Sequence, residues 1–91
     1  MTGVDDARLK RARFRSWHRG MREMDLILGR FADAALGALT VSELEQYERL
    51  LDISDTDLFA WITGAKAVPE GVDPIFLKVR AFGERVASQT S

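Results

Sequence analysis

The chain has 91 residues, of which 46% are hydrophobic, and its net charge is −1. This length favours one domain, and a domain of this size buries only about 60–65% of its unfolded surface, which argues against a deep internal cavity. Cysteine is absent and histidine occurs once, which excludes disulfides, thiolate nucleophiles and zinc sites built from cysteine or several histidines. No apolar run reaches 18 residues, so we predict no membrane span.

Helix start and stop signals indicate about five helices and no strand. The first, from about Asp5 to Trp17, is rich in arginine and weakly amphipathic, so we expect a loosely attached, basic N-terminal helix or arm. The second spans roughly residues 21–36, contains Gly29, which allows close helix approach, and stops at Gly37. The apolar face of the second helix consists of Met24, Ile27, Leu28, Phe31 and Ala35.

Two capping signals start the next helices. A capping box at Thr40–Glu43 starts the third, which runs to about Leu51. Ser54 starts the fourth, where nearby acids suit the positive helix end, and Gly64 ends it. The residues expected to point inward are Leu44, Tyr47, Leu50, Leu51, Leu58, Phe59, Trp61 and Ile62.

A loop over residues 65–72 leads to Asp73-Pro74, where a cap and a proline start the last helix. This helix is expected to run to about Val86, ahead of a frayed tail. Its inward stripe consists of Ile75, Val79, Phe82 and Val86. We therefore predict an all-α fold: a small, compact five-helix bundle that forms a single domain over residues 1–91. We expect its core at about residues 20–86, flexible termini and a monomeric state.

Charge is segregated along the chain. Residues 8–22 carry seven of the 13 basic residues and no acid, whereas residues 23–60 carry nine acids and two arginines. Such asymmetry usually concerns partners rather than fold. The basic segment, with Phe14 and Trp17, could bind nucleic acid, although the acids that follow argue against a broad basic face. Trp17 could stack on Arg13 or dock on a partner.

No catalytic constellation emerges from the residue inventory. Ser16 and His18, two residues apart, do not face each other on a helix. The carboxylate pairs Asp55/Asp57 and Glu43/Glu45 are better explained by capping and solvation. Glycine-rich nucleotide loops are missing. We therefore predict that the chain is not an enzyme and holds no cofactor stably.

The heptapeptide Arg19–Asp25, Arg-Gly-Met-Arg-Glu-Met-Asp, contains an RGxxE string that no packing rule requires. Without a Cβ, Gly20 lets a partner approach closely, and Arg19 could clamp a carboxylate. Glu23 could pair with a basic group of a partner or brace Arg19. The structural alternative makes Gly20 a turn, leaves the arginines solvated and uses the acids to favour the next helix. The predicted partner-binding residues are Arg19, Gly20, Met21, Glu23 and Asp25.

Two segments together resemble a known family. The RGxxE heptapeptide and residues 50–62, a Leu-Leu-Asp stretch leading to Trp61-Ile62, match in order and spacing the signatures of the SdhE-type flavinylation factors, the succinate dehydrogenase assembly factor family. The resemblance covers residues 8–80. The chain departs at His18 and Arg22, where members often carry an arginine and an apolar residue.

The resemblance implies a chaperone that binds the flavoprotein subunit of succinate dehydrogenase or fumarate reductase and promotes covalent FAD attachment. The FAD is carried by the client, and flavin and client perform the chemistry. It also implies that Arg19, Gly20 and Glu23 contact the client, with Asp25 extending the motif. The residues expected to support the fold are Leu50, Leu51, Trp61 and Ile62, with Asp52, Asp55 and Asp57 at the surface. The compartment would be the cytoplasm in a bacterium or the mitochondrial matrix in a eukaryote. A small nucleic-acid-binding or antitoxin-like adaptor remains the alternative.

Overall fold

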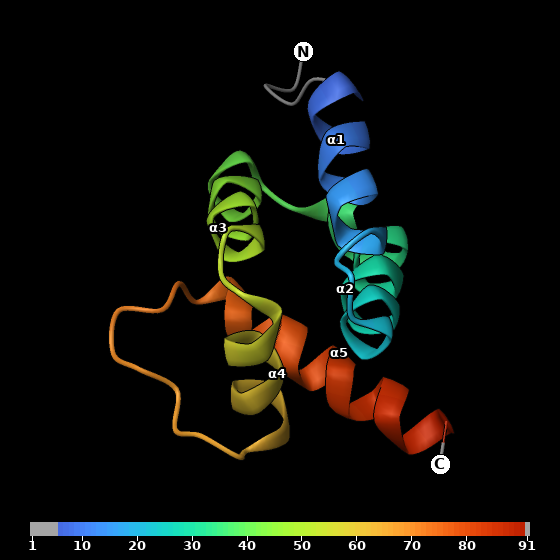
Figure 1. The fold of residues 1–91 in the computed structure, drawn as a ribbon. Coiled ribbons are helices and arrows are strands. Elements are labelled where there is room, and N and C mark those ends of the chain that lie inside the picture. Colours follow the sequence, from blue (N-terminus) through green and yellow to red (C-terminus); the bar gives the residue numbers. More distant parts are fainter. Residues whose placement is uncertain (1–5, 91) are drawn as a thin grey trace.

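The computed structural model describes the backbone of residues 6–90 and the side chains of residues 6–85. Within this part of the chain all regular structure is helical, which confirms the predicted all-α fold. The elements are α1 (Asp6–Trp17), α2 (Arg22–Ala35), the 3-10 helix η1 (Leu36–Ala38), α3 (Val41–Leu51), α4 (Asp55–Thr63) and α5 (Ile75–Thr90) (Figure 1).

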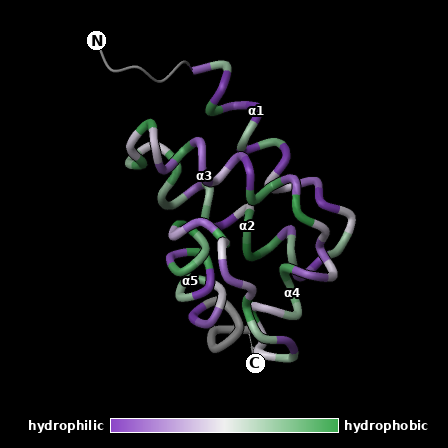
Figure 2. Tube along the Cα trace, turned by 90° about the vertical axis from the view of Figure 1, so that its left-hand side faces the viewer, coloured by the Kyte–Doolittle hydropathy of each residue, from purple (hydrophilic) through white to green (hydrophobic). Residues whose placement is uncertain are grey.

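The helices α1 and α2 pack against each other more extensively than any other pair of elements. Beside them, α3 lies next to α1 and α4 continues below it, while α5 crosses the base of the molecule (Figure 1). Hydrophilic residues dominate α1, whereas hydrophobic stretches of the other helices turn toward one another (Figure 2). The buried core consists of Ala12, Met24, Ile27, Leu28, Phe31, Ala32, Leu36, Leu44, Tyr47, Leu50, Leu51, Leu58, Ile62, Ile75, Phe76 and Val79.

The predicted capping residues of the third and fourth helices are confirmed. The Thr40 hydroxyl accepts from the Glu43 amide at 3.1 Å, and the Glu43 carboxylate accepts from the Thr40 amide at 3.0 Å, which completes the capping box. Ser54 accepts from the Asp57 amide at 3.2 Å at the start of α4. Gly64 ends α4 with a left-handed φ of 82°, a conformation that glycine adopts without a Cβ clash.

The start of α5 differs from the predicted cap. The Asp73 carboxylate does not cap the helix; it accepts two bonds from the Arg49 guanidinium, at 2.9 and 3.1 Å. The Gln46 side chain accepts from the Ile75 amide at 3.1 Å instead, so α3 supplies a cap for α5. A capping partner from another helix leaves no local sequence signal, whereas the Asp-Pro pair correctly indicated where the helix starts.

The expectation of a loosely attached first helix was wrong. The Trp17 ring lies so close to Gly29 that a Cβ placed there would come within 2.2 Å of it, and the Trp17 indole donates to Asp33 at 3.3 Å. The buried Ser16 hydroxyl donates to the Ala12 carbonyl at 2.7 Å and lies 2.6 Å from the Tyr47 hydroxyl. Thus α1 is an integral layer, and the core reaches Ala12 rather than starting near residue 20.

Smaller departures concern helix ends and half-buried positions. The second helix ends at Ala35 and tightens into η1, which contains the expected stop Gly37. The last helix continues to Thr90, beyond the predicted end, and the inward placement predicted for Val86 lies outside the described side chains. Phe76, absent from the predicted stripe, is buried. Four residues expected inside are only half-buried: Ala35, Phe59, Trp61 and Phe82.

Candidate functional site

The α1–α2 corner, residues 18–21, places the RGxxE string on the surface. His18 helps to end α1, because its Nδ1 donates to the Phe14 carbonyl at 2.8 Å and so satisfies a carbonyl of the last helical turn. Gly20 has a φ of 94°, in the left-handed region, and a Cβ built there would meet no atom within 4 Å. Glycine at this position is therefore required by backbone conformation, while the space in front of it is open.

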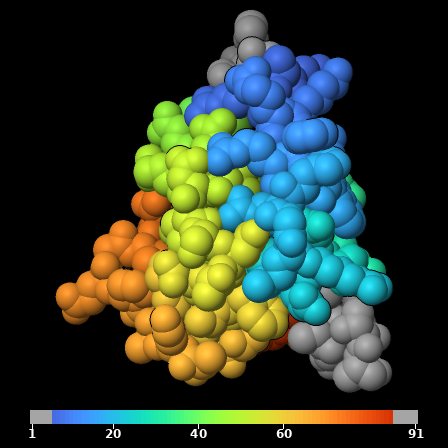
Figure 3. Space-filling view, in the orientation of Figure 1, coloured from blue at the N-terminus to red at the C-terminus, as the bar shows by residue number. Residues whose placement is uncertain are grey.

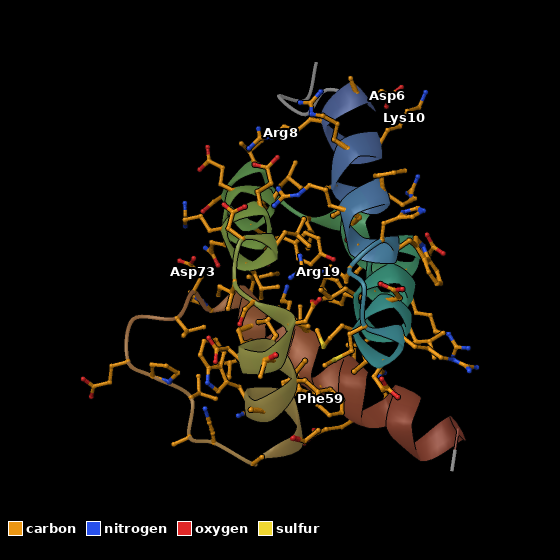
Figure 4. The ribbon with its side chains drawn as sticks, in the orientation of Figure 1. Asp6, Arg8, Lys10, Arg19, Phe59 and Asp73 are labelled. Carbon is orange, nitrogen blue, oxygen red and sulfur yellow. The ribbon has the colours of Figure 1, made fainter. Side chains whose placement is uncertain are left out.

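The Arg19 side chain points into the molecule, between the α3–α4 junction and the α1–α2 pair (Figure 4). Its Nε donates to Asp55 Oδ1 at 2.7 Å, Nη1 to the Leu51 carbonyl at 2.5 Å and Nη2 to the Ile53 carbonyl at 2.7 Å. Only 9% of the side chain is exposed. The guanidinium predicted to clamp a partner's carboxylate thus clamps a carboxylate of its own chain.

Helix ends explain why this position attracts an arginine. The last carbonyls of α3 have no partner within their own helix and form the negative end of its dipole, and Asp55 begins α4 directly afterwards. A planar guanidinium presents several N–H donors in fixed directions, which a lysine ammonium does not. Arg19 therefore fits a site that presents two carbonyls and one carboxylate. This contact joins the two sequence signatures, since Arg19 lies in the first and its acceptors in the second.

Asp25 also bonds within the chain. Its carboxylate accepts from the Arg19 backbone amide at 2.6 Å, across the corner. The Asp25 amide in turn donates to the Met21 carbonyl at 2.9 Å, which forms the first bond of α2. Met21 is half-buried and packs against the core. Asp25 and Met21 therefore fasten the corner to α2.

The side chains of Glu23 and Arg22 are exposed and make no hydrogen bond or ion pair with the side chains or backbone of residues 6–85. Glu23 does not brace Arg19, because Asp55 does so instead. In the space-filling view, the corner and the start of α2 lie beside the α3–α4 junction on one face of the molecule (Figure 3). We call the exposed stretch Gly20–Glu23 the RG edge. Of the five predicted partner-binding residues, Gly20 and Glu23 lie fully on this surface, Met21 partly, and the other two point inward.

A shallow groove adjoins the corner, a feature that the sequence did not predict. An exposed aromatic pair borders it, in which the Phe14 and His18 rings stack with centroids 4.0 Å apart. Phe14 is 63% exposed, an unusual state for a large apolar side chain. The groove is lined by Phe14, Arg15, His18, Arg19, Leu51, Ser54 and Asp55.

The segregated charges are largely explained by ion pairs between the basic segment and acids of the same chain. Arg8 binds Glu48 through two bonds of 2.6 and 2.8 Å, and this contact lowers the pKa of the Glu48 carboxyl. Further arginines of the basic segment pair with acids of α2, the α3–α4 junction and α4, as Arg13–Asp33 at 3.4 Å, Arg15–Asp52 at 2.6 Å and Arg19–Asp55 at 2.7 Å. Four of the seven basic residues of this segment thus pair with acids of neighbouring elements, which reduces the free cationic surface.

The other side chains considered for catalysis have structural partners in the folded chain. The Ser16 hydroxyl is buried and bonded to Ala12 and Tyr47, whereas the His18 ring is exposed and bonded to Phe14. Asp55 is held by Arg19, and its side chain is only 19% exposed, so it does not lie free at the surface as expected. Within the described residues no helix is both long and apolar enough to cross a membrane.

Sequence reasoning missed the acceptors of Arg19. The available signal was a matching order, because Arg8, Arg15 and Arg19 occur in the same order along the chain as their partners Glu48, Asp52 and Asp55. These acids belong to consecutive elements, since Glu48 lies on α3, Asp52 follows its end and Asp55 begins α4. The Trp17–Gly29 and Ser16–Tyr47 contacts left no comparable pattern.

Comparison with known proteins places these features in a family. Residues 10–83 match the family model described as flavinator of succinate dehydrogenase. A succinate dehydrogenase assembly factor 2, mitochondrial, from Yarrowia lipolytica is 39% identical over 87 residues, covering 88% of this chain and 60% of the relative. The FAD assembly factor SdhE from Acetobacter pasteurianus is 38% identical over 64 residues, covering 70% and 59%. A Dictyostelium discoideum succinate dehydrogenase assembly factor 2 is 41% identical over 70 residues, covering 77% and 50%. The chain thus spans about half to three fifths of the length of these relatives.

Proposed function

Since the chain belongs to the flavinator of succinate dehydrogenase family, we propose that it is an assembly factor for a flavoprotein. Its client is the flavoprotein subunit of succinate dehydrogenase or fumarate reductase, and its task is to promote covalent attachment of FAD to that subunit. The names of the relatives, an FAD assembly factor and succinate dehydrogenase assembly factors, support this assignment.

The observation that carries the proposal is the RG edge on its rigid base. Gly20 offers an open, Cβ-free backbone and Glu23 a carboxylate with no partner among the described side chains, next to a corner whose His18 and Arg19 side chains are already bonded. Such an edge can lie close against a partner's backbone while Glu23 meets a basic group. A fixed surface also loses little conformational entropy when it binds.

The chain contributes position, and the client and its flavin contribute the chemistry. Holding a mobile client region in a reactive geometry accelerates attachment without a catalytic side chain. Accordingly, we propose that this chain is not an enzyme and that it acts on FAD held by the client, without binding the cofactor stably itself. The mitochondrial or bacterial compartment stays a prediction.

A nucleic-acid adaptor is the weaker alternative. Affinity for nucleic acid depends on lysines and arginines that neutralise phosphates. Here four arginines of residues 8–19 are paired with acids of the same chain.

The proposed function is tested by mixing the purified apo flavoprotein subunit with FAD, with and without this chain. Denatured samples are then examined for in-gel flavin fluorescence, which reports covalent attachment. We expect fluorescence to appear faster with the chain. An equal rate with and without it, for subunits of both succinate dehydrogenase and fumarate reductase, would contradict the proposal.

Glu23→Ala tests the edge itself in the same assay. We expect this change to weaken client binding by roughly tenfold, because one interfacial charge contact is lost. The thermal unfolding midpoint should fall only slightly, because Glu23 has no bonded partner among the described residues and contributes only through the dipole of α2. Glu45→Ala, which removes an exposed glutamate from α3, is the matched control and should behave like the wild type. Equal binding by the two variants would remove Glu23 from the interface.

A further inference from the structure

The strongest unassigned feature is the contact between Arg19 and the α3–α4 junction. We call it the Arg19 clamp: the guanidinium with its acceptors Asp55 Oδ1, the Leu51 carbonyl and the Ile53 carbonyl. These acceptors lie 32 to 36 residues further along the chain. The exposed fractions of the two charged side chains are only 9% and 19%. Solvent therefore screens this pair less than a fully exposed ion pair.

The clamp fixes the corner directly beside its left-handed glycine. Gly20 follows Arg19 directly, and no other part of the chain approaches the position of its missing Cβ within 4 Å. Its left-handed conformation is thus held by the bonds of the neighbouring Arg19 rather than by packing around it. The guanidinium of Arg19 ties one end to the α3–α4 junction, and Asp25 ties the Arg19 amide to α2.

We propose that Asp55 is a positioning residue for the client-binding RG edge. It orients the Arg19 guanidinium, and Arg19 then sets the direction in which Gly20 and Glu23 face the client, without either clamp side chain touching the client. This inference rests on the proposed function, because the edge that is positioned is the one that the proposal assigns to the client.

A direct-contact role for Arg19 gives a different result. If the guanidinium bound a client carboxylate, removing it would weaken binding whether or not Asp55 were present. If it acts through the clamp, the two residues form one unit and the second loss adds nothing. A double-mutant cycle separates these cases, because groups that act as a unit give non-additive effects.

The experiment measures the Kd for the apo flavoprotein subunit with Arg19→Ala, Asp55→Ala and the double variant, well below their unfolding midpoints. Each single change is expected to weaken binding roughly tenfold, and the double variant no more than either one. Asp52→Ala is the matched control. It also removes an arginine-paired carboxylate from this junction, but its partner is Arg15 and its side chain is 73% exposed. Wild-type affinity is expected for this control.

Two results would overturn the inference. One is Asp55→Ala binding as tightly as Asp52→Ala. The other is an Arg19→Ala effect that persists undiminished when Asp55 is already replaced. If Asp55→Ala does not fold, Asp55→Asn takes its place in the cycle, because it keeps the side-chain shape and one acceptor oxygen.

A second readout, in the isolated chain, separates failure of the clamp from failure of the proposed function. Loss of Asp55 should speed hydrogen exchange of the Arg19 amide by roughly tenfold, because the corner opens more often. Asp52→Ala should leave this exchange unchanged. If the wild type does not bind the flavoprotein subunit, the proposed function fails while the exchange result still judges the clamp. Exchange that is unaffected by Asp55→Ala would contradict the clamp whatever the binding result.

Discussion

The α1–α2 corner and the loop over residues 65–74 both turn the chain through a left-handed glycine, but they are anchored differently. Each connects two helices through an exposed glycine in the left-handed region, with φ of 94° at Gly20 and 90° at Gly71. At both positions an added Cβ would meet no atom within 4 Å. Each segment is also tied to a neighbouring helix by an arginine–aspartate pair: Arg19–Asp55 ties the corner to the start of α4, and Arg49–Asp73 ties the loop to the last turn of α3.

The two anchors differ in burial and in number of partners. The Arg19 side chain is 9% exposed and also binds two carbonyls, whereas the Arg49 side chain is 60% exposed and, among the described residues, bonds to Asp73 alone. Exposed ion pairs contribute about 0–1 kcal/mol, because solvent screens them and long side chains lose entropy. The same pair of residue types therefore makes one connection rigid and leaves the other weakly fastened. We infer that the corner presents a surface and the loop serves as a connector.

The largest expected effect comes from breaking the packing that leads into the corner. Gly29→Val would place side-chain atoms where the Trp17 ring lies, within 2.2 Å at the Cβ. We expect the free energy of unfolding to fall by about 3 kcal/mol, as for severe overpacking, measured by urea denaturation. Gly37→Val is the control, because a Cβ there meets no atom within 4 Å. Equal stability of the two variants would show that the Trp17–Gly29 contact does not hold α1.

The second expected effect is a loss of folding stability at alkaline pH, which depends on Tyr47. Burial raises the pKa of Tyr47 to about 12, although Ser16 and Arg19 act in the opposite direction. Below pH 10 the phenol is neutral in both folded and unfolded chains. Between about pH 10 and 12 only the unfolded chain ionises, so stability is lost as pH rises, by roughly 2–3 kcal/mol in all.

Denaturation at several alkaline pH values, compared with Tyr47→Phe, measures this loss, since the chain contains one tyrosine. The variant should lack the tyrosine-dependent part of the decline. A wild-type curve parallel to that of Tyr47→Phe would mean that the phenol ionises equally easily in the folded protein.

The smallest expected effects come from removing each of the two anchors, Arg19 and Arg49, in turn. Arg19→Ala should lower the free energy of unfolding by about 2 kcal/mol, because a mostly buried carboxylate and two carbonyls lose their partner. Arg49→Ala should cost less than about 1 kcal/mol, as for other exposed pairs. Both values come from urea denaturation at pH 7 and moderate salt. If Arg49→Ala were the more damaging change, the contrast between corner and loop would be wrong.

Local signals predicted the helices well because each depends on neighbouring residues. Thr40 with Glu43, Ser54 and Gly64 fixed three helix ends, and helical periodicity identified the inward faces of α2 and α3. The Asp73-Pro74 signal also placed the start of α5 correctly, next to Ile75, but the side chain that caps it, Gln46 on another helix, left no local signal. The close attachment of α1 was not predicted either, because it depends on shape and on buried bonds between helices, at Trp17 and Ser16.

The sequence located the corner that carries the RGxxE string, but it did not predict how the Arg19 side chain lies. The RGxxE string located the corner, and Gly20 and Glu23 are exposed as a contact role requires. The direction of the Arg19 side chain could not be read from its own segment, because it depends on acceptors more than 30 residues away that lie nearby only in the folded chain. Carboxylates assigned to capping and solvation, such as Asp55, proved to be the partners of this charge.

The most direct test compares Gly20→Arg with Gly71→Arg in binding to the apo flavoprotein subunit. Both changes force a bulky residue into a left-handed conformation with open space around it, so both should cost a similar stability of about 1–2 kcal/mol. We expect Gly20→Arg to abolish binding and covalent flavin attachment, whereas Gly71→Arg should leave both unchanged. Equal affinity of the two variants for the client would contradict the claim that the corner is the surface this protein presents.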